Sequence, residues 1–157
     1  MVIFLGINSG NYHTKGIRFF EEALTLVKER WGDRAEIITT TDIPYCEYHT
    51  YFEKAHILLD QVFAFDQGYN ALEAMAQGKV VFTGAESEFL NQYGLQENEV
   101  AINALPDAEY LAQQLGDLIQ HPEKIAQISA NAQAFIRQHH DYIAVAQQYL
   151  QTWNSVN

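Results

Sequence analysis

Apolar residues follow two patterns along this chain: short runs that predict buried strands, and longer stretches in which they recur every three or four positions. The runs predict strands at 2–5, 35–39, 57–60, 80–82 and 100–102. The helical spacing predicts helices at 16–30, 45–54, 71–77, 86–93, 107–120, 122–139 and 143–153. Pro122 marks a helix start, and Asp141 is a candidate cap for the last helix.

The order of these elements predicts the fold. Strands that alternate with helices imply right-handed crossovers and a parallel sheet covered on both faces. After the last predicted strand only helices follow. We therefore expect an α/β fold, a Rossmann-like three-layer sandwich. It should have a parallel sheet of about five strands, helices on both faces and a helical C-terminal end. A single domain is expected to span residues 1–157.

The segment from Ile57 to Gly84 carries the most functional information. It has the pattern of a strand, a loop, a helix and a second strand, with Glu73 in the first turns of the helix. Ligands of open α/β sheets bind at the carboxyl ends of the strands, where helix N-termini point backbone N–H groups at anions. We therefore expect the functional site at this edge of the sheet.

Composition and charge narrow the classes of partner. Hydrophobic residues make up 48% of the 157 residues, so the chain is expected to fold. A net charge of −11 argues against nucleic acid as a partner, because such a surface repels polyanions. No apolar run reaches the roughly 18–20 residues that cross a bilayer, so direct membrane insertion is not expected. The single cysteine, Cys46, cannot form an internal disulfide and favours a cytoplasmic location.

Lys15 is the first candidate for chemistry. It ends the polar loop 6–15, which follows the first predicted strand and so has the position of a phosphate-binding loop. The glycines at 6, 10 and 16 match neither a P-loop nor the dinucleotide fingerprint. Two interpretations of Lys15 therefore stand on equal terms, a phosphate partner and a solvated lysine.

Glu73 is the second candidate. Its neighbours are apolar or small, so its helix is expected to be largely buried and its carboxylate to be paired. Near a helix N-terminus it could accept ribose hydroxyls, or it could be a structural acid that caps local N–H groups. The ligand role is favoured because the preceding loop supplies Gly68 for close approach of the backbone.

Other chemistry finds less support in the sequence. The six histidines lack the spacing of a zinc site, so no metal site is expected. Cys46 fits packing better than nucleophilic attack, and no serine stands in a nucleophile elbow. The aromatic residues at 45, 48, 51 and 52 have helical spacing and are expected in the core or at a domain contact. Covalent catalysis is therefore not expected.

Several short motifs carry a family resemblance. The most specific is LEAMAQGKVV at 72–81, and the others are IFLG with the Lys15-Gly16 pair, Tyr51-Phe52, the segment 55–61, His140-Asp141 and Tyr149-Leu150. With these motifs the chain resembles the C-terminal, donor-binding domain of retaining glycosyltransferases with two Rossmann-like domains. This is the glycosyl transferases group 1 family, which has the GT-B fold. The resemblance covers essentially the whole chain.

The resemblance implies a role for each candidate. The helix glutamate of the family typically binds the ribose of a nucleotide sugar, which implies this role for Glu73. The lysine after the first strand typically contacts the diphosphate, which implies Lys15. The loop before the helix faces the sugar and phosphates, and the end of the second strand lies near the base. These regions imply Gly68, Tyr69 and Asn70, with Thr40, Thr41, Asp42 and Asp66 as weaker candidates.

Two positions depart from the family pattern. Many members carry an earlier glutamate that contacts the donor sugar, and the corresponding residue here is Phe65. The adjacent Asp66 could substitute for it if the loop is shorter by a single residue. The family also often places an arginine ahead of the lysine, where this chain has Gly10.

The resemblance implies the donor-binding half of a longer enzyme of carbohydrate biosynthesis. That enzyme would transfer a hexosyl group to a glycan or another acceptor, with retention. The donor is a nucleotide-diphosphate sugar, no other cofactor is expected, and the absence of an Asp-x-Asp motif agrees with metal-independent transfer. An N-terminal acceptor-binding domain of the same protein is expected outside these residues, and it could also hold the enzyme at a membrane. This fragment alone is therefore expected to be inactive.

Two alternatives remain open. The chain could be part of a nucleotide-sugar epimerase with a similar two-domain architecture. It could also be a degenerate, non-catalytic interaction module, in which Lys15 and Glu73 would pair with protein groups rather than face an open cleft.

Overall fold

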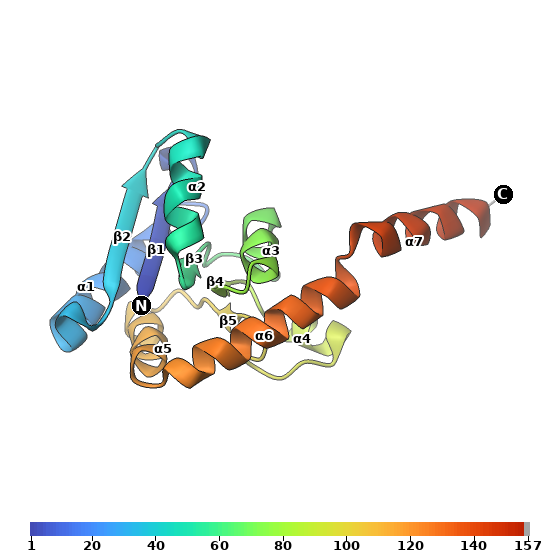
Figure 1. Cartoon of the computed structure of the whole chain (residues 1–157). Coiled ribbons are helices and arrows are strands. Elements are labelled where there is room, and N and C mark those ends of the chain that lie inside the picture. Colours follow the sequence, from blue (N-terminus) through green and yellow to red (C-terminus); the bar gives the residue numbers. More distant parts are fainter. Residues whose placement is uncertain (156–157) are drawn as a thin grey trace.

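The computed structural model describes residues 1–155 and shows a parallel sheet with helices on both faces (Figure 1). Its strands are β1 (Val2–Ile7), β2 (Glu36–Thr41), β3 (Ile57–Leu59), β4 (Val80–Thr83) and β5 (Ile102–Asn103). Every neighbouring pair in this five-stranded sheet is parallel. The predicted fold class is confirmed.

The helices lie close to their predicted positions. They are α1 (Ile17–Trp31), α2 (Tyr45–Lys54), α3 (Tyr69–Ala76), α4 (Ser87–Tyr93), α5 (Ala108–Gln120), α6 (Pro122–His139) and α7 (Tyr142–Ser155). Short 3₁₀ turns lie at η1 (Ser9–Asn11) and η2 (Gly32–Arg34). Asp141 accepts hydrogen bonds from the backbone N–H groups of Ile143 and Ala144, which confirms its predicted role as a cap.

The strand order, β2-β1-β3-β4-β5, creates a switch point in the middle of the sheet. The chain leaves β1 through α1 to reach β2 on one side, and it then returns through α2 to β3 on the other side. The connections therefore diverge above the carboxyl ends of β1 and β3. Open α/β sheets bind their ligands in the crevice that such a divergence leaves.

Successive side chains of the strands enter different cores, one on each face of the sheet. Ile3 and Leu5 of β1 belong to the core under α1 and α5, whereas Phe4 between them belongs to the core under α2, α3 and α6. All three are fully buried. Because β1 is buried on both faces, its sequence is a continuous apolar run rather than an alternating one.

A buried lysine holds the C-terminal end of α2. Nζ of Lys79 donates to the carbonyl oxygens of Glu53 at 3.2 Å and Ala55 at 3.0 Å, where an ammonium also meets the negative end of the helix dipole. Burial lowers the pKa of Lys79 below its ordinary value. This contact fixes the helix that carries Tyr45 and Tyr48 to the turn that precedes β4.

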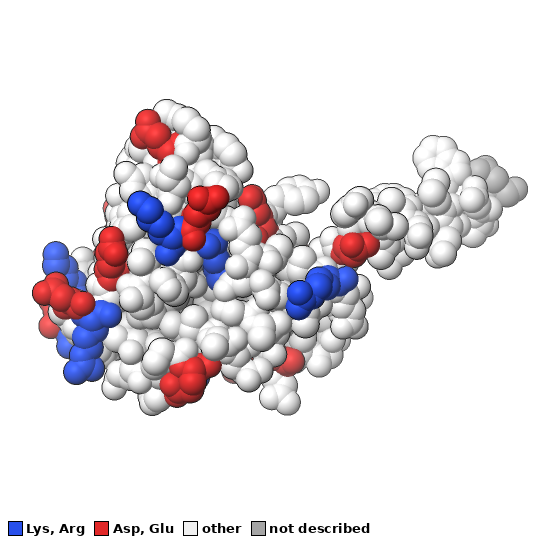
Figure 2. All heavy atoms as spheres, viewed as in Figure 1, with Lys and Arg blue, Asp and Glu red and all other residues white. Residues whose placement is uncertain are grey.

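Helix α7 extends away from the rest of the molecule (Figure 1). None of its residues is buried, and Tyr142–Ser155 contains no Asp, Glu, Lys or Arg. Figure 2 accordingly shows an arm without charged side chains beyond its base. Its large apolar side chains are exposed, Trp153 and Tyr149 by about three quarters. Among residues 1–155, no helix is long and apolar enough to cross a lipid bilayer.

Candidate functional site

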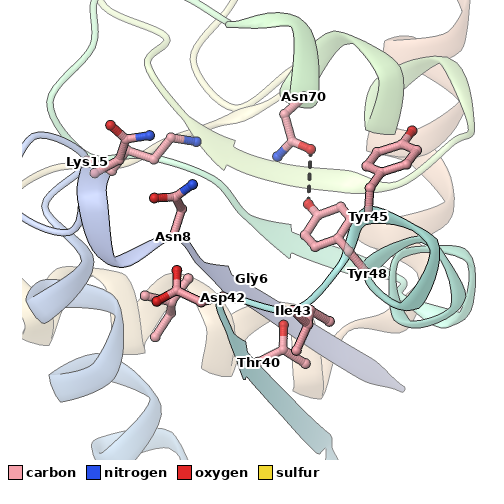
Figure 3. A pocket seen from close by; sticks show the side chains of 11 residues that line it. Gly6, Asn8, Lys15, Thr40, Asp42, Ile43, Tyr45, Tyr48 and Asn70 are labelled. Atoms are coloured by element: carbon pink, nitrogen blue, oxygen red, sulfur yellow. Dashed lines mark hydrogen bonds between the residues drawn. The ribbon is translucent and has the colours of Figure 1, made fainter.

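A cavity of about 350 Å³ opens at the carboxyl ends of β1 and β2, beside the N-terminal half of α2 (Figure 3). It is lined by Gly6, Ile7, Asn8, Asn11, Lys15, Thr40, Asp42, Ile43, Tyr45, Tyr48 and Asn70. These residues come from the loop after β1, the end of β2, α2 and the first turn of α3. The cavity therefore lies at the switch point, where the topology favours a ligand.

Asp60 is the centre of the polar network behind this cavity. It directly follows β3, and only 4% of its surface is exposed. Its Oδ1 accepts hydrogen bonds from Nζ of Lys15 and from Nδ2 of Asn70, both at 2.9 Å. Its Oδ2 lies 3.3 Å from the hydroxyl of Thr83 at the end of β4. A single carboxylate therefore joins the loop after β1, the start of α3 and the end of β4.

Tyr48 extends this network along the opposite wall. Its hydroxyl donates to Oδ1 of Asn70 at 3.0 Å, as Figure 3 shows. Burial of the phenol raises the pKa of Tyr48 to about 12, and the charges of Asp60 and Glu73 act in the same direction. A Cβ atom at Gly6 would lie 2.4 Å from Cε2 of Tyr48. Because Gly6 has no Cβ atom, the ring of Tyr48 can lie close to β1 and form part of the cavity wall.

The end of β2 forms the remaining wall. Asp42 has a φ of 49°, in the left-handed region, and its Oδ1 accepts a hydrogen bond from the backbone N–H of Ser9 at 2.9 Å. Hydrogen bonding from Ser9 lowers the pKa of Asp42. Thr40 lines the same cavity, and its hydroxyl is buried without a hydrogen-bond partner in residues 1–155. It is a polar group that a ligand could satisfy.

The structure brings only part of the predicted site together. Lys15, Asn70 and Asp42 line the cavity. The other candidates, which do not line it, are Gly68, Tyr69, Glu73, Thr41 and Asp66. Gly68 is the N-cap of α3 and Tyr69 its first residue, 93% exposed, so both adjoin Asn70 at the rim. Side chains alternate along a strand, so Thr40 rather than Thr41 faces the cavity.

Glu73 differs from its predicted setting. The buried face of α3 consists of Ala71, Ala74 and Met75, and Glu73 lies on the exposed face. The expectation of a buried, paired carboxylate was therefore wrong, because the apolar residues around Glu73 in the sequence point to the other side of the helix. The carboxylate of Glu73 makes no hydrogen bond or ion pair within the part of the chain that the structure describes.

Two residues of the network were missed by the sequence analysis. Asp60 follows an apolar strand directly, and a carboxylate in that position was the available signal for a site. Tyr48 was expected in the core because of its helical spacing, and its half-buried ring does pack on Phe4 at 5.1 Å. Its hydroxyl partner, Asn70, lies on another helix, so no local pattern indicated the contact.

The loop between β3 and α3 is fixed against the sheet. Gln67 donates to the carbonyl oxygen of Gly84 at 2.7 Å, and the N–H of Glu86 donates to the carbonyl of Phe65 at 3.0 Å. Phe63 and Phe65 remain exposed, by 55% and 73%. The exposed ring of Phe65 therefore lies at the position where the family that the sequence resembles often has a glutamate.

The charges of the cavity are unevenly distributed. Lys15 is the one cationic side chain among the described residues that line it, and Asp60 already pairs with that ammonium. Asp42 adds a carboxylate on the β2 side (Figure 3). Within residues 1–155 no three His, Cys, Asp or Glu side chains gather as a metal site.

Comparison with known proteins gives one family match and several structural neighbours. A sequence profile described as glycosyl transferase-like matches residues 10–151. No curated protein matches the chain in sequence. The C-terminal domain of a glycosyl transferase group 1 family protein (LpcC) from Francisella tularensis is similar with a TM-score of 0.67 and 18% identity. The match covers 90% of this chain and 86% of that one.

Two longer proteins share the fold. TarM from S. aureus, in a complex that includes UDP, has a TM-score of 0.73 and 11% identity, over 98% of this chain and 35% of that one. Sucrose-phosphate synthase from Thermosynechococcus elongatus has a TM-score of 0.70 and 19% identity, over 99% of this chain and 45% of that one. The chain therefore spans less than half the length of these two proteins.

Proposed function

The chain belongs to the glycosyl transferase-like family, and we propose that it binds the nucleotide-sugar donor of a glycosyltransferase. This proposal rests on the cavity at the switch point. Lys15 and Asn70 line it together with the aromatic rings of Tyr45 and Tyr48. A nucleotide sugar has matching parts: an anionic diphosphate, a polyhydroxylated sugar and a flat base.

We place the diphosphate beside Lys15 and the first turn of α3. An ammonium and the N–H groups of a helix N-terminus are the groups that stabilise phosphate oxygens and a departing diphosphate. Such stabilisation supports transfer without a metal ion. The base would then lie toward Tyr45 and Tyr48, whose rings are 6.4 Å apart and nearly parallel, with Thr40 at its edge. Glu73, on the exposed face of α3, would reach the ribose from the rim.

We propose that this chain acts together with a second, acceptor-binding domain of the same cytoplasmic protein. The short coverage of TarM and sucrose-phosphate synthase supports this, because each has more than half of its chain outside the match. Transfer of a hexosyl group with retention would require that domain. The chain alone is expected to bind a nucleotide weakly and to transfer no sugar.

The alternatives receive less support. The family match favours transfer over epimerisation. For a non-catalytic module, both Lys15 and Glu73 should be paired with protein groups. Lys15 is paired with Asp60, yet it also lines the cavity, and Glu73 has no such partner within residues 1–155.

The test is an NMR titration of the ¹⁵N-labelled 157-residue chain with UDP and, separately, with GDP, because this method detects millimolar binding. Shifts should concentrate at the loop after β1 and at the start of α3. Glu73→Ala should weaken binding, whereas Glu29→Ala, an exposed helical glutamate near the far end of α1, should not. Binding of neither nucleotide, or equal effects of the two variants, would contradict the donor-site proposal.

A further inference from the structure

We propose that Asp60 is the positioning residue of this site: its carboxylate holds the ammonium of Lys15 and the amide of Asn70 at the cavity wall, ready for the phosphate oxygens of a ligand. The inference rests on the proposed function, since it takes the ligand to carry a diphosphate. Asp60 itself does not line the cavity and acts through the two residues that do.

The burial of Asp60 is the first argument. Its side chain is 2% exposed, and a carboxylate taken out of water costs free energy that its partners must offset. A buried ion pair is often no more stabilising than apolar residues of the same volume. Stability alone therefore gives little reason for a carboxylate here. Its donors include the two side chains, Lys15 and Asn70, that face the cavity.

The direction of the hydrogen bonds is the second argument. Tyr48 donates to the oxygen of the Asn70 side chain, and the nitrogen of that side chain donates to Asp60. Both ends of the amide are therefore fixed, so its orientation is determined before any ligand arrives. In Figure 3 the Asn70 amide and the Lys15 ammonium accordingly lie near one another above the cavity.

The donor capacity of Lys15 is the third argument. An ammonium has three N–H donors, and Asp60 accepts from Lys15 at one oxygen. The Lys15 side chain is still 31% exposed, so the remaining donors can reach a phosphate oxygen while the carboxylate keeps its hold. Without Asp60, the flexible stem of the lysine would leave the ammonium mobile.

The backbone near Lys15 does not depend on Asp60. The N–H of Val62 donates to the carbonyl oxygen of Lys15 at 2.8 Å and ties the two loops together. The substitution Asp60→Asn should therefore release the ammonium while leaving the loop in place. Asp117→Asn is a matched control, because Asp117 accepts from Lys124 at 2.7 Å on the far helices α5 and α6.

The first arm of the test needs no ligand. NMR relaxation of the side-chain carbons should show the Lys15 ε-methylene to be more ordered than that of Lys28, which is exposed on α1. Asp60→Asn should abolish this difference, and Asp117→Asn should preserve it. A wild-type Lys15 as mobile as Lys28 would overturn the proposal, and this comparison holds even if Asp60→Asn does not fold.

The second arm compares UDP and GDP with uridine and guanosine. Asp60→Asn should weaken binding of the nucleoside diphosphates about tenfold, because part of one charge-assisted contact is lost. It should weaken binding of the nucleosides, which lack the diphosphate, less than about twofold. In a Lys15→Met background, Asp60→Asn should weaken diphosphate binding much less than it does in the wild type, because the part of its effect that passes through Lys15 is already lost and only the part through Asn70 remains. Equal losses for nucleoside and diphosphate, or additive losses, would overturn the inference. If the wild type binds no nucleotide, the proposed function fails, and the first arm still decides whether Asp60 fixes Lys15.

Discussion

The hydroxyl of Tyr48 lies 3.0 Å from the side-chain oxygen of Asn70, and this hydrogen bond joins α2 to the first turn of α3. The two helices follow different strands, so the contact closes the cavity from two sides. The same amide donates to Asp60, which links α2 to the loop after β1 through Lys15.

Tyr48→Phe should therefore lower the stability of the fold. The substitution keeps the ring against Phe4 but leaves the Asn70 oxygen without its donor, at an expected cost of about 1 kcal/mol. Urea denaturation measures the free energy of unfolding. Tyr51→Phe is the control, because Tyr51 also packs on Phe4 but is not hydrogen-bonded to Asn70. Equal losses in the two variants would argue against the role of the hydrogen bond.

The raised pKa of Tyr48 predicts a loss of stability at alkaline pH. The folded-state pKa of about 12 lies above the ordinary value of 10.0, so the folded protein holds this proton more tightly than the unfolded chain. The contribution is complete below pH 10 and is lost as the pH rises toward 12. Urea denaturation from pH 9 to 11.5 should show a steeper decline for the wild type than for Tyr48→Phe. Parallel declines would contradict this.

The Arg30–Glu109 pair predicts a loss of stability in acid. The two terminal guanidinium nitrogens of Arg30 each donate to the Glu109 carboxylate at 2.6 Å, and this lowers the pKa of Glu109 to about 2, from 4.5. The contribution is present above pH 4.5 and is lost as the pH falls through about 2. Glu109→Gln should therefore be less stable than the wild type at pH 7, and the difference should shrink at pH 2. A difference that stays constant with pH would count against the pair.

Two glycines near the site should respond differently to alanine. A Cβ at Gly84 would lie 2.3 Å from the backbone oxygen of Ala64, so Gly84→Ala should displace the loop 61–68 and cost about 1–3 kcal/mol. A Cβ at Gly68 would lie 3.8 Å from Nε2 of Gln61, an ordinary contact. Gly68→Ala should leave the melting temperature unchanged. If it nevertheless weakens nucleotide binding, the ligand approaches the backbone at Gly68.

Removal of α7 should leave the remaining fold intact. None of Tyr142–Ser155 is buried, so deletion of residues 142–157 should shift the melting temperature by less than about 2 °C. It should also reduce binding of an apolar dye, because the exposed side chains of Tyr149, Leu150 and Trp153 are lost. A fall in melting temperature of about 5 °C or more would show that the arm stabilises the body of the molecule.

The elements of this fold were largely predictable because their signals are local. The helices 45–54 and 122–139 begin and end where the sequence analysis placed them, and Pro122 is the first residue of the second one, as expected. The last strand was predicted at 100–102 but lies at Ile102–Asn103. Val100 and Ala101 are buried but precede Ile102, the first residue that pairs with β4. Their apolar side chains therefore indicated burial and not strand pairing.

The site was less predictable because its contacts join distant segments. Lys15 was expected in the loop after β1 and Asn70 in the loop before the next helix; Asn70 lies instead in the first turn of α3, and both residues line the cavity. Their shared partner, Asp60, is the acceptor for both side chains only because the sheet places β3 next to β1. The exposure of Glu73 depends on which side of α3 packs inward, and the apolar residues on both sides of it in the sequence concealed that direction.

The contacts around Asp60 also bear on how the molecule folds. Lys15 lies 45 positions from Asp60 along the chain and Thr83 lies 23 positions away, so the network cannot form inside any one βα unit. The loop-closure entropy of these contacts is offset only once β1, β3 and β4 have assembled. Competence to bind should therefore appear late in refolding, with the final docking of the sheet. A bound ligand would in turn raise the stability of the entire cooperative unit rather than that of one loop.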